Sequence, residues 1–420
     1  MLSGQDIERG LLPTVLDALG WSPAVAITGP RTTGKSTLAR HLVSRFGGSL
    51  LDLDEPSVRT LALDDPAAFI NGLDEPIVID EFQRAPELLS AIKAALNRDR
   101  RPGRFVLTGS ARHDAVPEIA DFLTGRVELL TLWPFAEAEL SPPGPTIIDE
   151  LFSGVAVDRR IEARLTRDDA VRLVVRGGYP IAVTSDPAAR ERWFANLAQL
   201  VVERITTDVQ PMRRGDVAHT MLRLAAARTA QISNAADIGR DAGLGRDQAG
   251  AYMRLLELVY LVIRLPAWST NVSSQQIKRP KVHLVDSGLA AHLQGATTFQ
   301  ASEPVAAKRF GALFETFVVT EFLKQLGWST TRATAFHYRT TRGLEVDLVL
   351  ETADGRVAGV EVKAGSRVRP DDLAGLRDLR DSLGSRFVGG LVVCTSPQGQ
   401  RVDDRIAVAP FETLWSSTPG

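Results

Sequence analysis

The stretch Gly29-Pro30-Arg31-Thr32-Thr33-Gly34-Lys35-Ser36 decides the fold of the N-terminal part of this chain. It has the spacing G-x-x-x-x-G-K-[ST], in which glycines let the backbone turn so that successive N–H groups point at phosphate oxygens. The apolar run 24–27 before it predicts a buried strand, and residues 36–45 after it predict a helix. We therefore predict a P-loop that binds ATP through these eight residues and Thr37, with Lys35 on the β- and γ-phosphates and Ser36 as a Mg²⁺ ligand.

A pair of carboxylates supplies the second half of the predicted ATP site. The run Ile77-Val78-Ile79 predicts a buried parallel strand, and Asp80 and Glu81 follow at its C-terminal end, where open α/β sheets bind their ligands. We expect Asp80 to be the second Mg²⁺ carboxylate and Glu81 to polarise the attacking water. After a further strand, Thr108 and Ser110 are both candidates to touch the γ-phosphate or the water, with a purely structural turn as the alternative.

The composition is that of a globular protein without a general affinity for nucleic acid or lipid. The 420 residues are 44% hydrophobic and 24% charged, with a formal net charge of −2, so any nucleic-acid contact must come from a local patch. The single cysteine, Cys394, excludes an internal disulfide and a cysteine-rich zinc site and favours a reducing cytoplasm. No apolar run is long enough to span a bilayer, so we expect no membrane partner.

Alternating strand and helix patterns from residue 21 to 140 predict an α/β domain with a parallel sheet and helices on both faces. We expect strands at 24–28, 49–53, 77–80, 104–108 and 127–132, and helices at 36–46, 64–72 and 86–97. A leading helix within 1–20 precedes this domain, and a linker and helical region at 141–211 follows it.

Residues 212–295 form a basic segment. Between 212 and 283 there are eleven Lys and Arg against five Asp and Glu. Helical patterns at 217–228, 234–241 and 246–259, followed by strand patterns at 262–265 and 281–285, predict a winged helix-turn-helix. Its basic residues would contact a DNA backbone, with a rigid arm or a protein-docking module as the alternative. They are Arg246 and Arg254, with Gln248, on the third helix, and Arg264, Lys278, Arg279 and Lys281 in or near the wing.

Residues 300–420 contain a second group of carboxylates. We expect Glu315 on a helix at 310–324, Asp347 on a hairpin at 336–339 and 345–350, and Glu361 and Lys363 on one face of a strand at 357–363. A helix at 370–383 and a strand at 387–394 complete an α/β core. A metal-dependent phosphodiesterase needs carboxylates that hold Mg²⁺ and a lysine beside the attacking hydroxide. The candidate Mg²⁺ ligands are Glu315, Asp347 and Glu361, and Glu345 could join them. An ion pair of Lys363 with Asp347 or Glu361 is an equally good alternative.

With these motifs in view, the chain resembles bacterial and archaeal P-loop ATPases that join an AAA-type domain to a winged helix and a restriction-endonuclease-like domain of the PD-(D/E)xK type. The matching stretches are Gly29 to Ser36, Ile77 to Phe82, Leu107 to Ser110, Gly125 to Val127, Gly177 to Pro180, Val285 to Leu289, Phe314-Glu315, Glu345 to Asp347 and Glu361 to Lys363. The resemblance implies a nuclease-like fold for residues 300–420, with Asp347, Glu361 and Lys363 where that superfamily carries its catalytic trio.

Arg126 lies near the end of the predicted ATPase domain. In oligomeric ATPases of the AAA type, an arginine in this region often reaches a γ-phosphate and neutralises the charge that develops on it. We expect Arg126 to serve this purpose in its own subunit or in a neighbouring subunit of a homo-oligomer, with a surface ion pair as the alternative.

Two functions remain open from the sequence. In the first, an ATP-hydrolysing enzyme acts on DNA, and its C-terminal domain cleaves phosphodiester bonds with Mg²⁺. In the second, ATP drives a regulatory switch, and the nuclease-like domain is a non-catalytic binding module. A small-molecule kinase is a weaker third reading, because the long C-terminal modules have no use in it.

Overall fold

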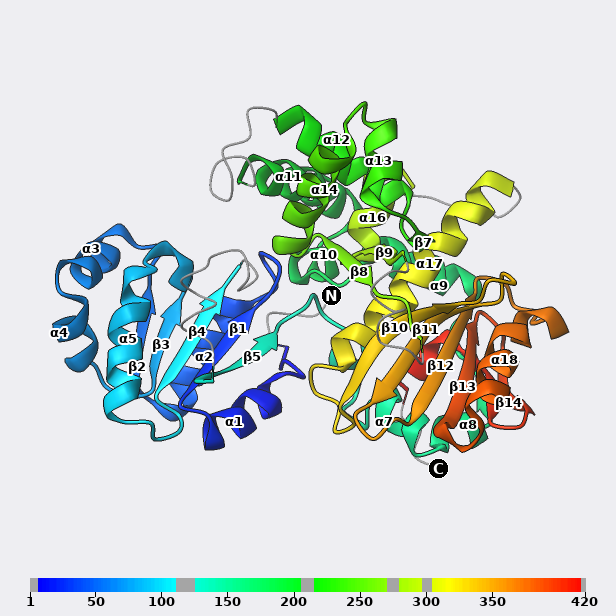
Figure 1. Ribbon diagram of the computed structural model, residues 1–420, viewed down its shortest axis with the longest axis horizontal. Helices are drawn as coiled ribbons and strands as arrows, with labels where there is room; N and C mark the ends of the chain where they lie inside the picture. The colour runs from blue at the N-terminus through cyan, green and yellow to red at the C-terminus, as the bar shows by residue number, and fades with distance from the viewer. Residues whose placement is uncertain (1–6, 111–124, 205–214, 270–278, 297–303, 417–420) are drawn as a thin grey trace. The chain divides into compact units, whose positions relative to one another are not determined.

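The computed structural model describes residues 7–110, 125–204, 215–269, 279–296 and 304–416, which Figure 1 draws in colour. The chain divides into two compact units. The P-loop unit holds Gln5–Pro134 together with Leu258–Tyr260, and the C-terminal unit holds Phe135–Glu257 and Leu261–Gly420. The predicted boundaries at 211/212 and 295/300 both fall inside the C-terminal unit, so its helical, basic and α/β parts pack together.

A parallel five-stranded sheet forms the centre of the P-loop unit, with the strand order β2-β3-β4-β1-β5. Its strands are β1 (Ala24–Thr28), β2 (Ser49–Asp52), β3 (Ile77–Asp80), β4 (Phe105–Gly109) and β5 (Val127–Thr131). Every residue of β1 and β3 is buried, as expected for strands covered on both faces. These bounds agree with the predicted strands to within one residue at each end.

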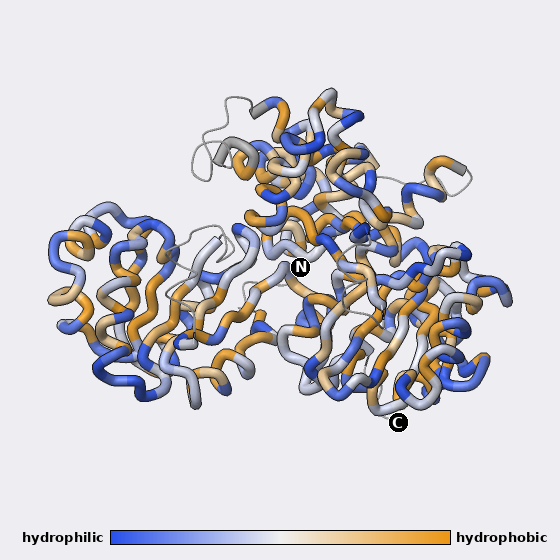
Figure 2. Tube along the Cα trace, in the orientation of Figure 1, coloured by the Kyte–Doolittle hydropathy of each residue, from blue (hydrophilic) through white to orange (hydrophobic). Residues whose placement is uncertain are grey.

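Helices cover both faces of this sheet because alternate strand residues point to opposite sides. Ala24, Ala26, Ile77 and Ile79 pack in one apolar cluster with α5 (Glu87–Arg98), and Val25, Ile27 and Val78 pack in another with α1 (Leu12–Trp21) and α2 (Lys35–Phe46). The apolar colouring of the central strands in Figure 2 follows from this double burial.

The predicted helix at 64–72 is confirmed to within two residues at its start and one at its end, but a second helix that precedes it was not predicted. The structure has two helices there, α3 (Pro56–Asp64) and α4 (Pro66–Asn71). Asp65 separates them, and its side chain accepts a hydrogen bond from the backbone N–H of Ala68 at 3.0 Å, which caps α4. Each helix begins with a proline, which suits a first turn whose N–H groups have no partner within the helix.

The C-terminal unit begins with short helices and continues through three helices and a small antiparallel sheet of order β7-β9-β8. The helices are α7 (Ile147–Phe152), α8 (Val155–Asp158), α9 (Arg167–Arg176), α10 (Pro180–Thr184), α11 (Pro187–Arg204), α12 (Gly215–Ala227), α13 (Ala235–Asp241) and α14 (Arg246–Leu258); the strands are β7 (Gln231–Ile232), β8 (Val262–Leu265) and β9 (Lys281–Leu284). The three helices and two strands predicted for the basic segment lie where they were expected. Lys278 lies outside the described residues.

A mixed sheet of order β10-β11-β12-β13-β15-β14-β6 carries the rest of this unit. Its strands are β10 (Ala333–Arg339), β11 (Glu345–Thr352), β12 (Val357–Lys363), β13 (Phe387–Cys394), β15 (Ile406–Pro410), β14 (Gln398–Asp403) and β6 (Ile161–Glu162), and its helices include α16 (Ser287–Leu293), α17 (Pro304–Gln325) and α18 (Ala374–Leu383). Strands β10, β11 and β12 run antiparallel, and β12, β13 and β15 run parallel. The predicted hairpin and the strands at 357–363 and 387–394 are confirmed.

Backbone hydrogen bonds join the small sheet to the large one. The N–H of Trp268 donates to the carbonyl of His337 at 2.6 Å, and the N–H of His337 donates to the carbonyl of Pro266 at 2.9 Å. His337 belongs to β10, so the chain that leaves β8 pairs with the outer strand of the large sheet.

Two glycine motifs of the sequence meet at a buried aspartate. Asp286 accepts hydrogen bonds from the N–H of Gly178 at 2.7 Å and from the N–H of Leu289 at 2.8 Å, which caps α16. Gly177 has φ +67°, and a Cβ at this position would collide with the Asp286 carboxylate. Glycine is therefore required at 177 by both backbone conformation and space.

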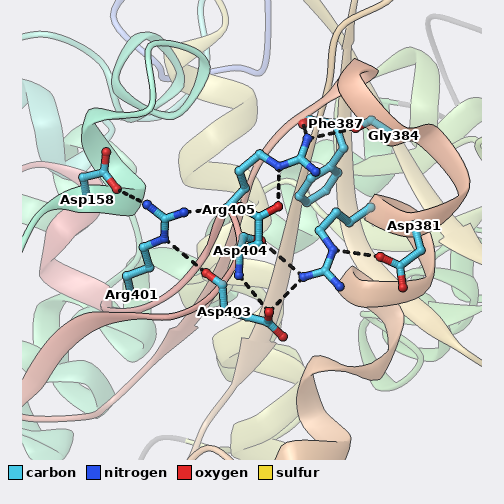
Figure 3. A network of polar contacts seen from close by, with 9 residues as sticks. Asp158, Asp381, Gly384, Phe387, Arg401, Asp403, Asp404 and Arg405 are labelled. Carbon is cyan, nitrogen blue, oxygen red and sulfur yellow. Dashed lines mark hydrogen bonds and ion pairs between the residues drawn. The ribbon is translucent and has the colours of Figure 1, made fainter.

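A surface network of arginines and aspartates fixes the turn between β14 and β15 (Figure 3). Arg380 pairs with Asp403 and Asp381, and Arg405 donates to the carbonyl oxygens of Gly384 at 2.8 Å and Phe387 at 2.6 Å. Such exposed pairs contribute little stability singly. Within the described ranges, none of the helices combines the length and apolar character that crossing a membrane requires.

Candidate functional sites

The P-loop follows β1 and ends in the first turn of α2. Gly34 precedes the helix with φ +95°, and a Cβ at Gly29 would collide with the carbonyl oxygen of Leu132, so both positions require glycine. The Lys35 side chain is 4% exposed and donates to the carbonyl oxygens of Gly29 at 3.0 Å and Pro30 at 2.7 Å. Burial is the main cause that lowers the pKa of Lys35 to about 8.

Sequence reasoning missed the arginine that supports this loop. The Arg9 guanidinium donates to the carbonyl oxygen of Thr33 at 2.6 Å and to that of Trp133 at 2.7 Å. It thereby ties the loop to the chain that follows β5. Only the tertiary structure reveals this role, because Arg9 lies 24 residues before Thr33 in the sequence.

The C-terminal ends of β3 and β4 bring the predicted carboxylates and hydroxyls together. The Thr108 hydroxyl donates to Asp80, which is 4% exposed, and accepts from the N–H of Glu81 at 3.3 Å. The Ser110 hydroxyl donates to the Glu81 carboxylate at 3.0 Å. The Thr108 hydroxyl therefore orients the Asp80 carboxylate, and the Ser110 hydroxyl orients the Glu81 carboxylate.

Gln83 is a second residue that the sequence did not reveal. Its side-chain amide donates to the Glu81 carboxylate and, at 3.1 Å, to the Ser110 hydroxyl. Glu81 itself has φ +55°, a left-handed conformation that is uncommon outside glycine. Its carboxylate is thus held by two side chains above a strained backbone position, an arrangement found most often at functional sites.

The side chains at this edge fit a magnesium nucleotide. Mg²⁺ prefers oxygen ligands, and the Ser36 hydroxyl in the first turn of α2 and the buried Asp80 carboxylate supply them. Arg31, Thr32, Thr33 and Thr37 complete the loop and the helix start. Ser36 and Thr37 also lie where the positive end of the helix dipole favours phosphate.

Arg126 lies at the opposite ends of the strands in the same sheet, at the N-terminal end of β5. The register pairs Val127 with Ala24 and Thr131 with Thr28, so Arg126 precedes the start of β5, whereas the P-loop follows the end of β1. With a strand rise of about 3.3 Å per residue, the backbone of Val127 lies about 13 Å from the level of Thr131. This placement does not favour a role for Arg126 at the ATP site of its own subunit.

In the C-terminal unit, three predicted or candidate metal ligands surround a lysine. The Nζ atom of Lys281, on β9, lies 2.6 Å from Glu315 Oε1, 3.0 Å from Glu345 Oε1 and 2.6 Å from Asp347 Oδ1. Lys281 is 2% exposed, so the expectation that it contacts a DNA backbone is wrong. The sequence placed Lys281 in a solvated wing because its partners lie 34 to 66 residues further along the chain.

The other predicted residues of this site are also paired. Lys363 donates to Glu361 Oε1 at 2.6 Å, which is the ion pair that the sequence left as an alternative. The second oxygen of Asp347 accepts the N–H of Val362 at 2.8 Å, so Asp347 and the Glu361–Lys363 strand are adjacent as predicted. The resting arrangement does not fit Mg²⁺, because an ammonium already occupies the point on which these oxygens converge, and in the described part of the chain no group of three acidic, histidine or cysteine residues has metal-binding geometry.

The pKa values reflect this crowding. Burial alone would lower the pKa of Lys281, but Asp347, Glu315 and Glu345 outweigh it and raise that pKa well above its usual value. Burial, with the negative charge of Asp347 as the second cause, raises the pKa of Glu315 well above normal and that of Glu361 to about 8. The lysine is therefore held as a cation among carboxyls that resist further negative charge.

An arginine-lined groove crosses the basic segment. It has a volume of about 850 Å³ and lies between α13, α14 and the small sheet. Arg246, Arg254, Arg264 and Arg279 line it, together with the single acidic residue Asp247. Arg279 also lines a second groove, of about 840 Å³, with His337, Tyr338 and Arg339 of β10.

Known families match this chain in three consecutive parts. Residues 22–141 match the family described as an AAA domain, and residues 167–300 and 310–414 match two domains of unknown function, DUF8612 and DUF4143. The uncharacterized proteins Rv2008c of Mycobacterium tuberculosis and Mb2031c of Mycobacterium bovis are each 32% identical over 349 residues, which cover 83% of this chain and 72% of the relative.

Solved structures show weaker likeness. The Walker-type ATPase PABY2304 of Pyrococcus abyssi is 16% identical with a TM-score of 0.41, over 69% of this chain and 95% of that one. A RuvB variant of Thermotoga maritima is 20% identical with a TM-score of 0.30, over 61% of this chain and 89% of that one.

Proposed function

The chain belongs to the family of the mycobacterial proteins Rv2008c and Mb2031c, with an AAA domain of the P-loop ATPase type, and from this premise we propose that it hydrolyses ATP with Mg²⁺. The observation that carries the proposal is the Glu81 carboxylate, which Ser110 and Gln83 hold at the strand edge that also presents Asp80. A P-loop that only bound nucleotide would not need a positioned second carboxylate.

Each side chain has a separate role in this proposal. Lys35 would leave the carbonyl oxygens of Gly29 and Pro30 and bind the β- and γ-phosphates. Ser36 and Asp80 would hold Mg²⁺, which neutralises charge on the phosphates when it is bound. Glu81 would accept a proton of the attacking water and orient it, and Ser110 and Gln83 would keep the carboxylate in place. Arg126 would contribute only from a neighbouring subunit of a homo-oligomer.

Phosphate release from ATP tests this proposal. Lys35→Ala should abolish release, and Glu81→Gln should slow it by about 10²- to 10⁴-fold while ATP binding is retained. Glu87→Gln, an exposed carboxylate on α5, is the matched control and should leave the rate unchanged. Release that persists in Lys35→Ala would refute ATP hydrolysis at this site.

We further propose that α12, α13, α14 and the small sheet form a winged helix whose groove binds the DNA backbone. Arg264 and Arg279 are paired with Glu257 and Asp237, so the excess positive charge that suits phosphates comes from Arg246 and Arg254 against Asp247. In fluorescence anisotropy with a labelled duplex, Arg246→Ala with Arg254→Ala should weaken binding and lower the salt slope by roughly two. Arg332→Ala, exposed elsewhere in the unit, is the control. An unchanged salt slope in the double variant would favour a protein-docking module.

For the C-terminal domain, the contacts of Lys281 favour the switch over Mg²⁺-dependent cleavage. The nuclease-like fold remains our interpretation of the mixed sheet, but no cleavage step follows from paired carboxylates. Single- and double-stranded DNA incubated with Mg²⁺, with and without ATP, should stay intact. Cleavage that disappears in Asp347→Ala would instead make the protein an ATP-regulated nuclease in the cytoplasm.

A further inference from the structure

The carboxylates Glu315, Glu345 and Asp347 converge on one point, and a lysine of another sheet fills it. Three charge-assisted contacts of 2.6, 3.0 and 2.6 Å reach the same Nζ atom. The contact with Asp347 Oδ1 is a hydrogen bond, and the contact with Glu315 Oε1 is an ion pair without hydrogen-bond geometry. Lys281 is 2% exposed, so its pairing with the carboxylates is shielded from solvent.

We infer that Lys281 is a built-in cation, and that Glu315, Glu345 and Asp347 take its ammonium in place of a divalent metal ion. Magnesium would need oxygen atoms about 2.0–2.1 Å from the ion, so the three carboxylates, now 2.6–3.0 Å from Nζ, would have to move toward the position that Nζ occupies. The two cations therefore exclude each other, because one set of oxygens cannot surround both.

The backbone keeps this lysine in place. Lys281 belongs to the middle strand of the small sheet, where it is paired with Ile232 on β7 and with Leu265 on β8. The carbonyl oxygen of Arg279, two residues earlier, lies 3.1 Å from His337 Nε2 on β10. With the backbone bonds between Pro266, Trp268 and His337, these contacts fix β9 against the large sheet.

Departure of the ammonium therefore requires the small sheet to part from β10, and a side-chain rotation is not enough. As long as the sheets are joined, the carboxylates hold the basic segment instead of a catalytic metal. The C-terminal domain then binds β9 through Lys281. In the proposed switch, β9 is therefore the segment that the non-catalytic module binds within its own chain. This inference does not depend on ATP hydrolysis or on DNA binding.

Manganese counting by electron paramagnetic resonance tests the inference on the full chain without nucleotide. The wild-type protein and Asp347→Asn should bind the same number of Mn²⁺ ions, because the Lys281 ammonium occupies the carboxylate cluster in both proteins. Lys281→Met should bind one ion more, and that ion should be lost again in Lys281→Met with Asp347→Asn. Lys308→Met, an exposed lysine on α17, is the matched control and should match the wild type.

The results separate the two halves of the inference. If the wild-type protein holds a Mn²⁺ ion that Asp347→Asn removes, Lys281 does not exclude metal and the inference is wrong. If folded Lys281→Met gains no ion, the carboxylates do not form a cation site and the replacement of a metal is refuted. The comparison of the wild type with Asp347→Asn needs no lysine variant, so it decides the first half even if Lys281→Met does not fold.

Discussion

Removal of the Lys281 ammonium should strongly destabilise the C-terminal unit. In Lys281→Met, Glu315, Glu345 and Asp347 would lose the buried cation that they share, and among the described residues Glu345 would keep only Arg339 at 3.7 Å. A hydrogen bond between charged groups, such as the one from Lys281 to Asp347, is worth about 1.5–3 kcal/mol, and removal of the ammonium also removes the cost of burying its charge. We therefore expect a net loss of about 3–5 kcal/mol in the free energy of unfolding at pH 8, the range for breaking a buried ion pair.

The loss should shrink as the pH falls. Burial and mutual repulsion hold the pKa of Glu315 well above its usual value, and loss of the lysine would raise it further. A carboxyl whose pKa is raised by folding costs stability above its unfolded pKa, and the cost vanishes as the pH falls toward that value. At pH 5 the variant should thus lie closer to the wild type than at pH 8.

Hydrogen–deuterium exchange of β11 amides over a urea series would measure this loss in the C-terminal unit alone. Lys308→Met should differ from the wild type by no more than about 0.5 kcal/mol. Adding Glu315→Gln to Lys281→Met should recover part of the loss, because it removes one of the repelling charges. If Lys281→Met and Lys308→Met are equally stable at pH 8, the lysine is not the counter-ion of this cluster.

Three further predictions concern the ATP site, the histidine between the sheets and the buried aspartate. Ser110→Ala should lower kcat for phosphate release about tenfold with an unchanged KM for ATP, because one bond to the Glu81 carboxylate is lost while Gln83 retains another; an unchanged kcat would contradict this. Burial lowers the pKa of His337 to about 4, so the unfolded state binds the proton first and stability should fall by up to about 3 kcal/mol between pH 6.5 and 4. His337→Asn should remove that slope in urea titrations, and a wild-type slope in the variant would exclude His337 as its source. Asp286→Ala should cost about 2–5 kcal/mol and speed the exchange of α16 amides, since two buried N–H groups lose their acceptor; unchanged exchange would show that water replaces the carboxylate.

The sequence predicted the elements whose signals are local. Strands β1, β3 and β13 have the predicted bounds, because a strand that is buried on both faces is a continuous apolar run. Strand β12 also has the predicted bounds, although Glu361 interrupts its apolar run. The P-loop was equally readable, since its glycines, lysine and serine carry their roles within eight residues. The helix expected at 64–72 is present as α4, but α3 before it was missed, because apolar periodicity does not show that Asp65 separates two helices and caps the second.

Partners that are distant in the sequence could not be predicted. Lys281 alternates with Val282 on a short strand, a pattern typical of one solvated face, yet every residue of β9 is buried. No residue near Lys281 in the sequence indicates that Glu315, Glu345 and Asp347 are its partners. Gln83 offered a weak signal, because it follows Glu81 by two residues and enters a short 3-10 helix, Phe82–Arg84, that turns its side chain back to the carboxylate.

The two residues of β6, Ile161 and Glu162, make the C-terminal sheet a product of two separated stretches of chain. They pair with Gly399 and Gln398 of β14, and the side chains of Leu151 and Val157 lie close beside Gly389 of β13. A fragment that started near residue 300 would leave β14 as an open edge, which invites pairing with another copy. The C-terminal part should therefore aggregate when it is produced alone, and recombination among relatives could transplant it only together with residues 147–162.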